Sequence, residues 1–210
     1  MSDQPLAPPR RVLGVVLAGG ASSRFGSPKW WAQIAGQSMA SRAVSALRPG
    51  TAKVVALSTD RELATLGIEV RPDLVPGEGP LGAVRTALSW ADELALEGAF
   101  VLACDLPLVS GALVQAVVTS WVDEDAVVPY STRGPEPLCA LYRSGLLDAV
   151  EAMLARGERA PTRLLEVIRV GRFPVDAAKA LSGVDDPFVN VNTREGHRIA
   201  EAELIRRALE

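Results

Sequence analysis

The sequence predicts an α/β fold, with a mostly parallel sheet between two layers of helices in one domain. Short apolar runs alternate with segments of helical spacing along almost the whole chain. These runs are apolar at successive positions, as expected for strands that are buried on both faces of a parallel sheet. A length of 210 residues with 48% hydrophobic content suits one three-layer core.

The first expected strand is the apolar run from Val12 to Leu17. It leads into residues 18–23, which have almost no side chains, so the backbone can approach a ligand and direct its N–H groups at anionic oxygens. Arg24 and Lys29 bring two cations to the same loop. A backbone cradle with two positive charges is suited to a triphosphate.

Two better-known phosphate loops are excluded by spacing. A Walker A loop needs Lys directly after Gly, whereas Ser27 and Pro28 separate Gly26 from Lys29. A dinucleotide fingerprint needs G-x-G-x-x-G, which Gly19-Gly20 with Gly26 does not supply. The alternative left open is an ordinary strand-to-helix turn that carries two solvated cations.

The remaining elements follow from apolar spacing. Further strands are expected at residues 52–57, 68–71, 99–103, 126–128, 138–142 and 169–173. Helices are expected at residues 39–47, 61–66, 81–96, 111–121, 145–155, 160–167 and 195–209. In the third of these helices, Leu81, Val84 and Leu88 should face inward, and Thr193 could cap the last.

Composition excludes several classes of protein. The net charge of −3 and the absence of a basic run argue against nucleic-acid binding. No apolar stretch approaches the ~20 residues that span a bilayer, and the Pro-rich residues 1–10 lack the apolar region of a signal peptide. We expect residues 1–10 to be a flexible leader to a domain at 11–210. Cys104 and Cys139 are expected to be reduced thiols, which favours the cytoplasm.

Two carboxylates follow expected strands. Asp105 comes directly after the strand at 99–103 and before Leu106-Pro107, where it could bind Mg²⁺ or serve as a plain turn residue. Asp73 precedes the loop Gly79-Pro80-Leu81-Gly82, which could recognise a base such as guanine or simply start a helix. Because ligands bind at the carboxyl ends of strands in open α/β sheets, both residues should border one site.

Histidine chemistry is excluded, and the aromatic residues leave two alternatives. His197 is the only histidine and should lie on the surface, so neither a Ser–His–Asp triad elsewhere nor a His-rich metal site is possible. Trp30 and Trp31 could stack on a ligand or pack beneath the phosphate loop.

Five segments together resemble the molybdenum cofactor guanylyltransferases, within the Rossmann-like nucleotidyltransferases. They are LAGGASSRFGSPK (17–29), GPLG (79–82), CDLP (104–107), EPLCALY (136–142) and FVNVNT (188–193). The resemblance extends from Val12 to about Ile199. The first segment is typical of the whole superfamily. Gly19-Gly20 and the closing NVNT favour the guanylyl branch over its cytidylyl sister.

The resemblance implies a role for each matching position. The backbone of Leu17, Ala18, Gly19 and Gly20, with Arg24 and Lys29, would hold the GTP phosphates, and Asp105 would bind Mg²⁺. Arg24, Lys29 and Asp105 would thus be the catalytic set. Asp73, Ser58, Gly79, Pro80 and Leu81 would contact the nucleotide, while Asn190 and Asn192 would line the pterin pocket. The first half of the domain would bind nucleotide and the second half the acceptor.

The function implied is transfer of GMP from GTP to molybdenum-bound molybdopterin, with release of pyrophosphate. The alternatives are cytidylyl transfer to the same pterin, NTP-dependent transfer to a sugar or polyol phosphate, and GTP binding without chemistry. Transient contacts with cofactor-synthesising proteins and apo-molybdoenzymes are implied as well. The sequence departs from the family pattern at Arg194, which replaces a proline, and at Trp30-Trp31, which replace small or aliphatic residues.

Overall fold

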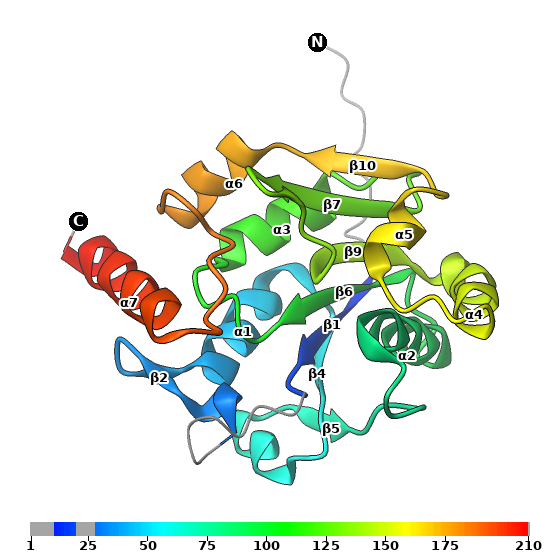
Figure 1. Cartoon of the computed structure of the whole chain (residues 1–210), viewed down its shortest axis with the longest axis horizontal. Helices are drawn as coiled ribbons and strands as arrows, with labels where there is room; N and C mark the ends of the chain where they lie inside the picture. The colour runs from blue at the N-terminus through cyan, green and yellow to red at the C-terminus, as the bar shows by residue number, and fades with distance from the viewer. Residues whose placement is uncertain (1–10, 20–27, 210) are drawn as a thin grey trace.

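A seven-membered path of strands forms the centre of the protein, as seen in the computed structural model, which describes residues 11–19 and 28–209 (Figure 1). The strand order is β10-β7-β9-β6-β1-β4-β5, and β8 pairs with β7. The strands are β1 (Val12–Leu17), β4 (Lys53–Leu57), β5 (Glu69–Arg71), β6 (Gly98–Ala103), β7 (Ala126–Ser131), β8 (Gly134–Pro135), β9 (Cys139–Arg143) and β10 (Val170–Phe173).

The sheet is mostly parallel, as predicted. β1 pairs in parallel with β4 and β6, β4 pairs with β5, and β10 pairs with β7 in the same sense. Only β9, within the described sheet path, runs against its neighbours β6 and β7. The carboxyl ends of β1, β4, β5 and β6 therefore meet at one edge of the sheet.

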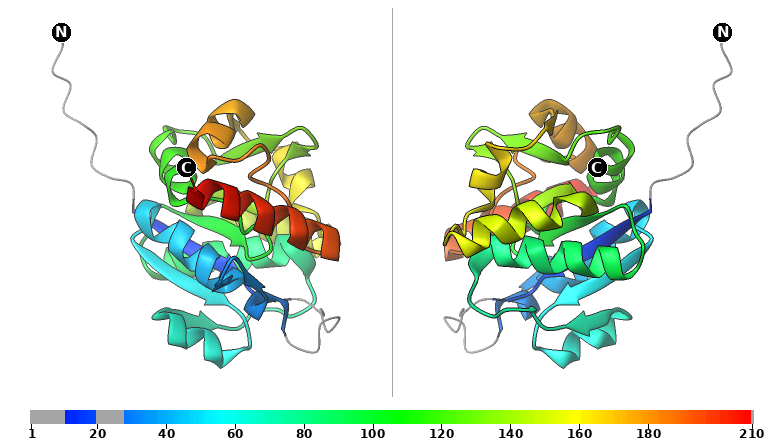
Figure 2. Two further views of the ribbon diagram at one scale, coloured as in Figure 1. Left: turned by 90° about the vertical axis from the view of Figure 1, so that its left-hand side faces the viewer. Right: turned by 90° about the vertical axis from the view of Figure 1, so that its right-hand side faces the viewer.

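Helices cover both faces of the sheet (Figures 1 and 2). Along β1, Val12 and Val16 belong to a core shared with α1 (Met39–Leu47) and α3 (Gly111–Thr119). Leu13 and Val15 belong to the opposite core, shared with α2 (Gly79–Glu93) and α4 (Leu147–Ala155). Because successive side chains of a strand point to opposite faces, an all-apolar strand is what a two-sided core requires.

The expected elements are present, with differences at their ends. α1 begins after Ser38, whose hydroxyl accepts from the Ser41 N–H at 3.2 Å. The helix expected at 81–96 is α2 and starts at Gly79, because Pro80 fits the first turn of a helix. The segment 61–66 is the 3₁₀ helix η3 (Arg61–Leu66), and helix 145–155 opens as η4 (Ser144–Leu146).

Other predicted helices are shorter than expected, and some elements were not predicted. Residues 160–167 contain the short α5 (Pro161–Leu165). The hairpin of β2 (Gln33–Ile34) and β3 (Gln37–Ser38), and β8, carry no clear periodicity because each strand has two residues. The eight-residue helix α6 (Val175–Ser182) was also not predicted. The last helix is α7 (Arg194–Leu209), and the Thr193 hydroxyl accepts from the Gly196 N–H at 3.0 Å, as predicted for a cap.

α7 joins a small third core away from the two sides of the sheet, which contains Ile34, Val191 and Ala200. The His197 ring is half-buried, and its Nε2 lies 2.8 Å from the Gln33 carbonyl oxygen. His197 therefore has a structural contact to β2. No helix among residues 11–19 and 28–209 is both long and apolar enough to cross a membrane.

Candidate active site

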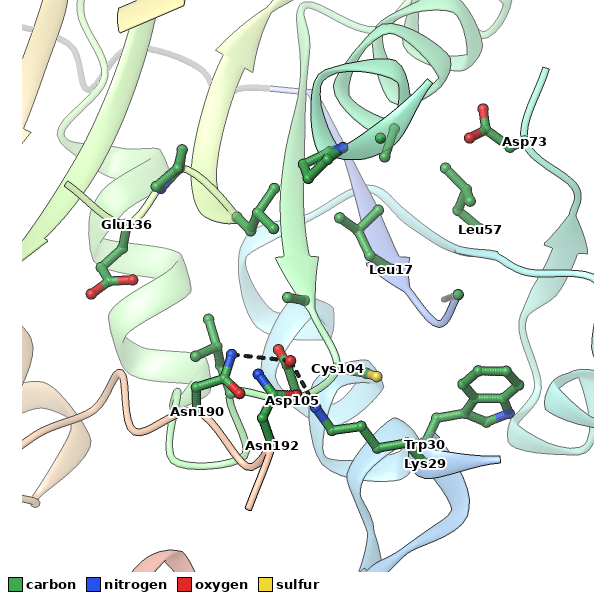
Figure 3. Close-up of a pocket in the computed structure, with 18 of the residues that line it drawn as sticks. Leu17, Lys29, Trp30, Leu57, Asp73, Cys104, Asp105, Glu136, Asn190 and Asn192 are labelled. Atoms are coloured by element: carbon green, nitrogen blue, oxygen red, sulfur yellow. Dashed lines mark hydrogen bonds and ion pairs between the residues drawn. The ribbon is translucent and has the colours of Figure 1, made fainter. Parts of the chain in front are cut away.

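A cavity of about 820 Å³ opens at the carboxyl ends of β1, β4 and β6 (Figure 3). Its first wall contains Leu17, Gly19, Leu57, Asp73, Gly79 and Pro80. Its second wall contains Glu136, Pro137, Leu138, Asn190 and Asn192. Asp105 and Lys29 lie between the walls, where the two sets of residues meet (Figure 3).

Asp105 is the centre of a polar cluster. The Lys29 ammonium lies 2.9 Å from Asp105 Oδ2, and Asn190 Nδ2 donates to the same oxygen at 3.0 Å. Lys29 also donates to Asn192 Oδ1. The Lys29 side chain is 10% exposed and that of Asp105 21% exposed, so the pair is largely shielded yet open to the cavity. Residues predicted to bind phosphate, metal and acceptor are thus brought together.

The segment that carries Asn190 and Asn192 is tied to the Asp105 loop through the backbone. The Val191 N–H donates to the Asp105 carbonyl oxygen at 2.9 Å. The Val191 side chain is buried in the third core, whereas its two asparagine neighbours are exposed to the cavity. Val191 thus anchors the segment in the core, while the asparagines on either side of it present their amides to the cavity.

Asp73 borders the cavity from the first wall, on the opposite side from Asn190 (Figure 3). The buried Thr86 hydroxyl donates to Asp73 Oδ1 and accepts from the Leu74 N–H at 3.3 Å. Thr86 belongs to α2, so the helix fixes the orientation of this carboxylate. Its second oxygen has no hydrogen-bond partner among the described residues and is available to a ligand.

The segment Gly79-Pro80-Leu81 contributes residues to both the cavity and the core. Gly79 and Pro80 line the cavity, and Gly79 has a positive φ of +72°, which favours glycine. Leu81 is fully buried, and its N–H donates to the Arg159 carbonyl oxygen at 3.0 Å. The predicted inward positions Val84 and Leu88 are also fully buried.

The first loop is described only in part. Leu17 and Gly19 line the cavity, whereas Ala18 is buried and its N–H donates to the Leu57 carbonyl oxygen at 3.1 Å. Gly20 and Arg24 lie outside the described residues. Ser58 is buried, and its hydroxyl accepts from the Asp60 N–H at 3.1 Å.

Glu136 is a cavity residue to which the sequence assigned no role. It lies in the turn before β9, and burial raises the pKa of its carboxyl group despite the Arg133 guanidinium 3.5 Å away. Glu136 lines the second wall of the cavity. Its position before Pro137 in a recognised segment is the signal that could have identified it.

Trp30 and Trp31 follow Lys29 in the 3₁₀ turn η1 (Lys29–Trp31). Trp30 lines the cavity, and both tryptophans pack against the core shared with α1 and α3, so each of the two predicted alternatives describes part of their environment. Both indole N–H groups donate to Asp60 Oδ2, at 2.7 and 2.8 Å. Asp60 was not predicted from the sequence, because an aspartate before a short helix is normally only a cap.

The cysteines are free and buried, as predicted. Cys104 lies beside Asp105, and burial raises the pKa of its thiol to about 12, so the group is neutral at physiological pH. Burial raises the pKa of the Cys139 thiol as well. Neither thiol has the thiolate character of a nucleophile.

The charges of the cavity bear on its ligand. Its described lining residues include three carboxylates (Asp73, Asp105 and Glu136) and one ammonium, that of Lys29. No group of three His, Cys, Asp or Glu residues that could hold a metal occurs among the residues described. A hard cation at Asp105 would therefore take its other ligands from a phosphate and from water, which suits Mg²⁺.

Comparison with known proteins agrees with this geometry. Residues 14–172 match the family described as "MobA-like NTP transferase domain". A Rhizobium meliloti protein named molybdenum cofactor guanylyltransferase is 35% identical over 200 residues, covering 90% of each chain. A Pelotomaculum thermopropionicum protein with the same name, qualified as probable, is 31% identical over 184 residues, covering 87% of this chain and 88% of its own.

Solved structures share the fold. The Archaeoglobus fulgidus molybdopterin-guanine dinucleotide biosynthesis protein A superposes with a TM-score of 0.75 at 24% identity, covering 93% of this chain and all of its own. A Mycobacterium tuberculosis protein solved with manganese superposes with a TM-score of 0.66 at 16% identity, covering 91% of this chain and 98% of its own. At these identities the likeness concerns the fold alone.

Proposed function

The chain belongs to the MobA-like NTP transferase family, and from this premise we propose that it transfers GMP from GTP to molybdenum-bound molybdopterin. The products are molybdopterin guanine dinucleotide and pyrophosphate. One observation carries the proposal: the Lys29–Asp105–Asn192 cluster joins the phosphate loop, the strand-end carboxylate and the closing NVNT segment within hydrogen-bonding distance. Nucleotidyl transfer needs the α-phosphate, a metal and an acceptor at one point.

The first wall would bind the nucleotide. Gly19 offers a backbone without a side chain, and Arg24 and Lys29 would supply positive charge for the phosphates. Guanine donates from N1–H and from its exocyclic amine, so Asp73, held by Thr86, would accept from it. Gly79 and Pro80 would form a rigid border beside the base.

The second wall would bind the acceptor. Asn190 and Asn192 supply amides that donate and accept, which suits a pterin with both kinds of group. Glu136 lies on the same wall and adds an acceptor at a shielded position. In this proposal the second half of the chain selects the pterin, while the first half selects the nucleotide.

A divalent cation, with magnesium as the expected ion, would bind Asp105. Its donor chemistry fits, because a carboxylate with one further amide neighbour leaves coordination positions for phosphate and water. The ion would neutralise charge on the phosphates, and it would release Lys29 from its ion pair with Asp105.

The reaction needs no protein nucleophile. An oxygen of the terminal molybdopterin phosphate forms a bond to the α-phosphorus, and the bond from that phosphorus to the bridging oxygen of the β-phosphate breaks. The electron pair leaves on pyrophosphate. Lys29 would stabilise the charge that develops on the transferred group, and the two walls would align attacking and leaving oxygens.

A panel of nucleoside triphosphates tests the proposal. GTP, CTP, ATP and UTP are incubated with molybdenum-loaded molybdopterin and magnesium, and the dinucleotide product and pyrophosphate are both measured. We expect product mainly from GTP. Product mainly from CTP would show that the protein is a cytidylyltransferase. Nucleotide binding without pyrophosphate release would contradict catalysis.

Lys29→Ala, measured in the same assay, tests the role proposed for the cluster. Loss of one preorganised charge typically lowers the rate about 10²–10³-fold. An unchanged rate in this variant would contradict the role proposed for the cluster. Transient contact with proteins that supply molybdopterin or receive the product is part of the proposal and follows from the relatives' named activity.

A further inference from the structure

The two indole N–H groups of Trp30 and Trp31 converge on one carboxylate oxygen. They reach Asp60 Oδ2 at 2.7 and 2.8 Å, although Asp60 lies in a different loop from the two tryptophans, which are neighbours in η1. Hydrogen bonds from neutral donors to an ionised acceptor are short and roughly twice as strong as neutral ones. The donation from Trp30 is the main reason that the pKa of Asp60 is lowered, so the acceptor stays ionised.

Asp60 is itself held by hydrogen bonds to two nearby residues of the chain. Its N–H donates to Ser58 Oγ at 3.1 Å, and its Oδ1 accepts from the Glu62 N–H at 3.0 Å. It therefore joins the end of β4 to the start of η3. The oxygen that receives the indoles is fixed by the sheet edge and not by the tryptophans alone.

The turn that carries Lys29 depends on contacts with the rest of the fold. Trp30 and Trp31 pack against the core shared with α1 and α3, and the Ala32 N–H donates to the Lys29 carbonyl oxygen at 3.0 Å. η1 is a single 3₁₀ turn, with no side-chain cap at Pro28. One such turn has no stability of its own, so its orientation depends on tertiary contacts. Residues 30 and 31, which make these contacts to Asp60, immediately follow the lysine.

Lys29 must present its ammonium to the reacting phosphate with little freedom. A free lysine side chain loses rotamer entropy when it is fixed, and a displaced one loses alignment with the phosphate. In the structure the two residues that follow Lys29 are bound to Asp60 through their indoles, and the Lys29 ammonium is bound to Asp105. The two aspartates hold opposite ends of one short unit.

We propose that Asp60 is a positioning residue for nucleotidyl transfer, because it fixes the Trp30–Trp31 pair and thereby aims Lys29 at the phosphates. This inference rests on the proposed function. It accounts for Trp30-Trp31, where the sequence departs from the small or aliphatic residues of the family pattern. The alternative is that Asp60 only stabilises η3 and the adjacent loop.

Asp60→Asn is the main test variant. An asparagine has one acceptor oxygen, so it cannot receive both the indoles and the Glu62 N–H as the carboxylate does. Trp31→Phe is the second variant, because it removes one donor and keeps an aromatic ring. Asp148→Asn, at an exposed position in the first turn of α4, is the control for loss of a negative charge.

The first measurement follows the indole N–H signals of the four tryptophans by nuclear magnetic resonance. In Asp60→Asn we expect the signals of Trp30 and Trp31 to shift, while those of Trp90 and Trp121 stay in place. Trp30→Phe and Trp31→Phe assign the signals. Unshifted signals would overturn the inference at its first step.

The second measurement is a double-mutant cycle with Lys29→Ala. We expect Asp60→Asn to lower kcat/KM for magnesium–GTP about tenfold, and to cause no further loss when Lys29 is already alanine. A purely structural role would give an equal loss in both backgrounds and would overturn the inference. So would normal kinetics in a variant whose indole signals have shifted.

Failure here is distinguishable from failure of the proposed function. If the wild-type protein transfers another nucleotide instead of GMP, the same cycle is run with that nucleotide, and the inference stands or falls on the coupling to Lys29. If the wild type binds magnesium–nucleotide without transfer, the coupling is read from the dissociation constant. A wild type that binds none of the four nucleotides would overturn both proposals.

Discussion

The two walls of the cavity differ in how the chain builds them. In the first wall, Leu17 and Leu57 end adjacent parallel strands, and Asp73 follows the next strand by two residues. Their common location follows from the direction of the strands. In the second wall, Asn190 belongs to an irregular segment. This segment is held by the hydrogen bond from the Val191 N–H to the carbonyl oxygen of Asp105, a residue far earlier in the chain.

Further side-chain hydrogen bonds hold the second wall. Arg133, in the turn between β7 and β8, donates to Asp186 Oδ2 at 2.7 Å and to the Phe188 carbonyl oxygen at 2.8 Å. Tyr142 is fully buried and donates to the Pro137 carbonyl oxygen at 2.7 Å. The comparison teaches that strand topology brings the residues of the first wall together, whereas the second wall depends on individual long-range contacts.

The largest effect is expected where the walls meet. Asp105→Asn removes the charge that faces Lys29 and the oxygen expected to bind the metal. We expect kcat/KM to fall about 10²–10³-fold, with partial recovery at raised magnesium concentration. Magnesium titration of the initial rate measures this effect, and Asp148→Asn is the control. A normal rate at the usual magnesium concentration would place the metal elsewhere.

Within the first wall, Asp73→Asn tests recognition of the base. The remaining oxygen can still accept from Thr86, so the orientation is kept while the charge is lost. A hydrogen bond to a charged group contributes about 1.5–3 kcal/mol, so kcat/KM for GTP should fall about 10–100-fold. Rates with GTP and with inosine triphosphate, which lacks the exocyclic amine, measure the loss of selectivity.

The control for this variant is Asp92→Asn, at an exposed position near the end of α2. The expected pattern is a loss for GTP that exceeds the loss for the inosine nucleotide. An equal loss for both nucleotides would show that Asp73 does not read the amine. The first wall would then act on the sugar or the phosphates.

Within the second wall, Arg133→Gln tests whether long-range bonds position the acceptor segment. The Arg133 side chain is 56% exposed, so its ion pair contributes little to the free energy of unfolding. We expect KM for molybdopterin to rise about threefold to tenfold, with KM for GTP unchanged, because only the second wall moves. Arg163→Gln, which breaks an exposed ion pair with Glu166, is the control.

The smallest effect concerns Glu136 and pH. Burial raises the pKa of Glu136, so the folded state favours the protonated form of its carboxyl group. The free energy of unfolding therefore decreases as the pH rises through the pKa of Glu136 in the folded state. Glu136→Gln should therefore raise the melting temperature at neutral pH, by no more than about 4 °C. The difference should vanish below about pH 4, where the carboxyl group is protonated in both states.

Melting curves between about pH 4 and 8 measure this difference. The groups that act on Glu136 are Ser131, Arg133 and Asp186, and the first two oppose the effect of burial by favouring the ionised form. A gain in melting temperature of Glu136→Gln over the wild type that increases as the pH falls would contradict this prediction. It would mean that the attraction to Arg133 exceeds the cost of burial.

By itself, the sequence determined the fold class and the first wall. Apolar runs such as Val12–Leu17 specify buried strands, and parallel strands bring their carboxyl ends to one edge, so Asp73 and Asp105 could be assigned to one site. The motif at 188–193 allowed Asn190 and Asn192 to be assigned by resemblance, and the structure places both in the cavity.

Only the tertiary structure decided which side chains bind one another. Lys29 meets Asn192 across 163 positions, and Trp30 meets Asp60 across 30. Ser58 and Leu81 are further examples. Both belong to segments at the site and were predicted to contact the nucleotide, but packing buries their side chains in the fold. Strand periodicity and turn chemistry act over a few residues, whereas these contacts depend on how helices and loops pack. Local pattern therefore fixes where a segment lies, and packing fixes what its side chains touch.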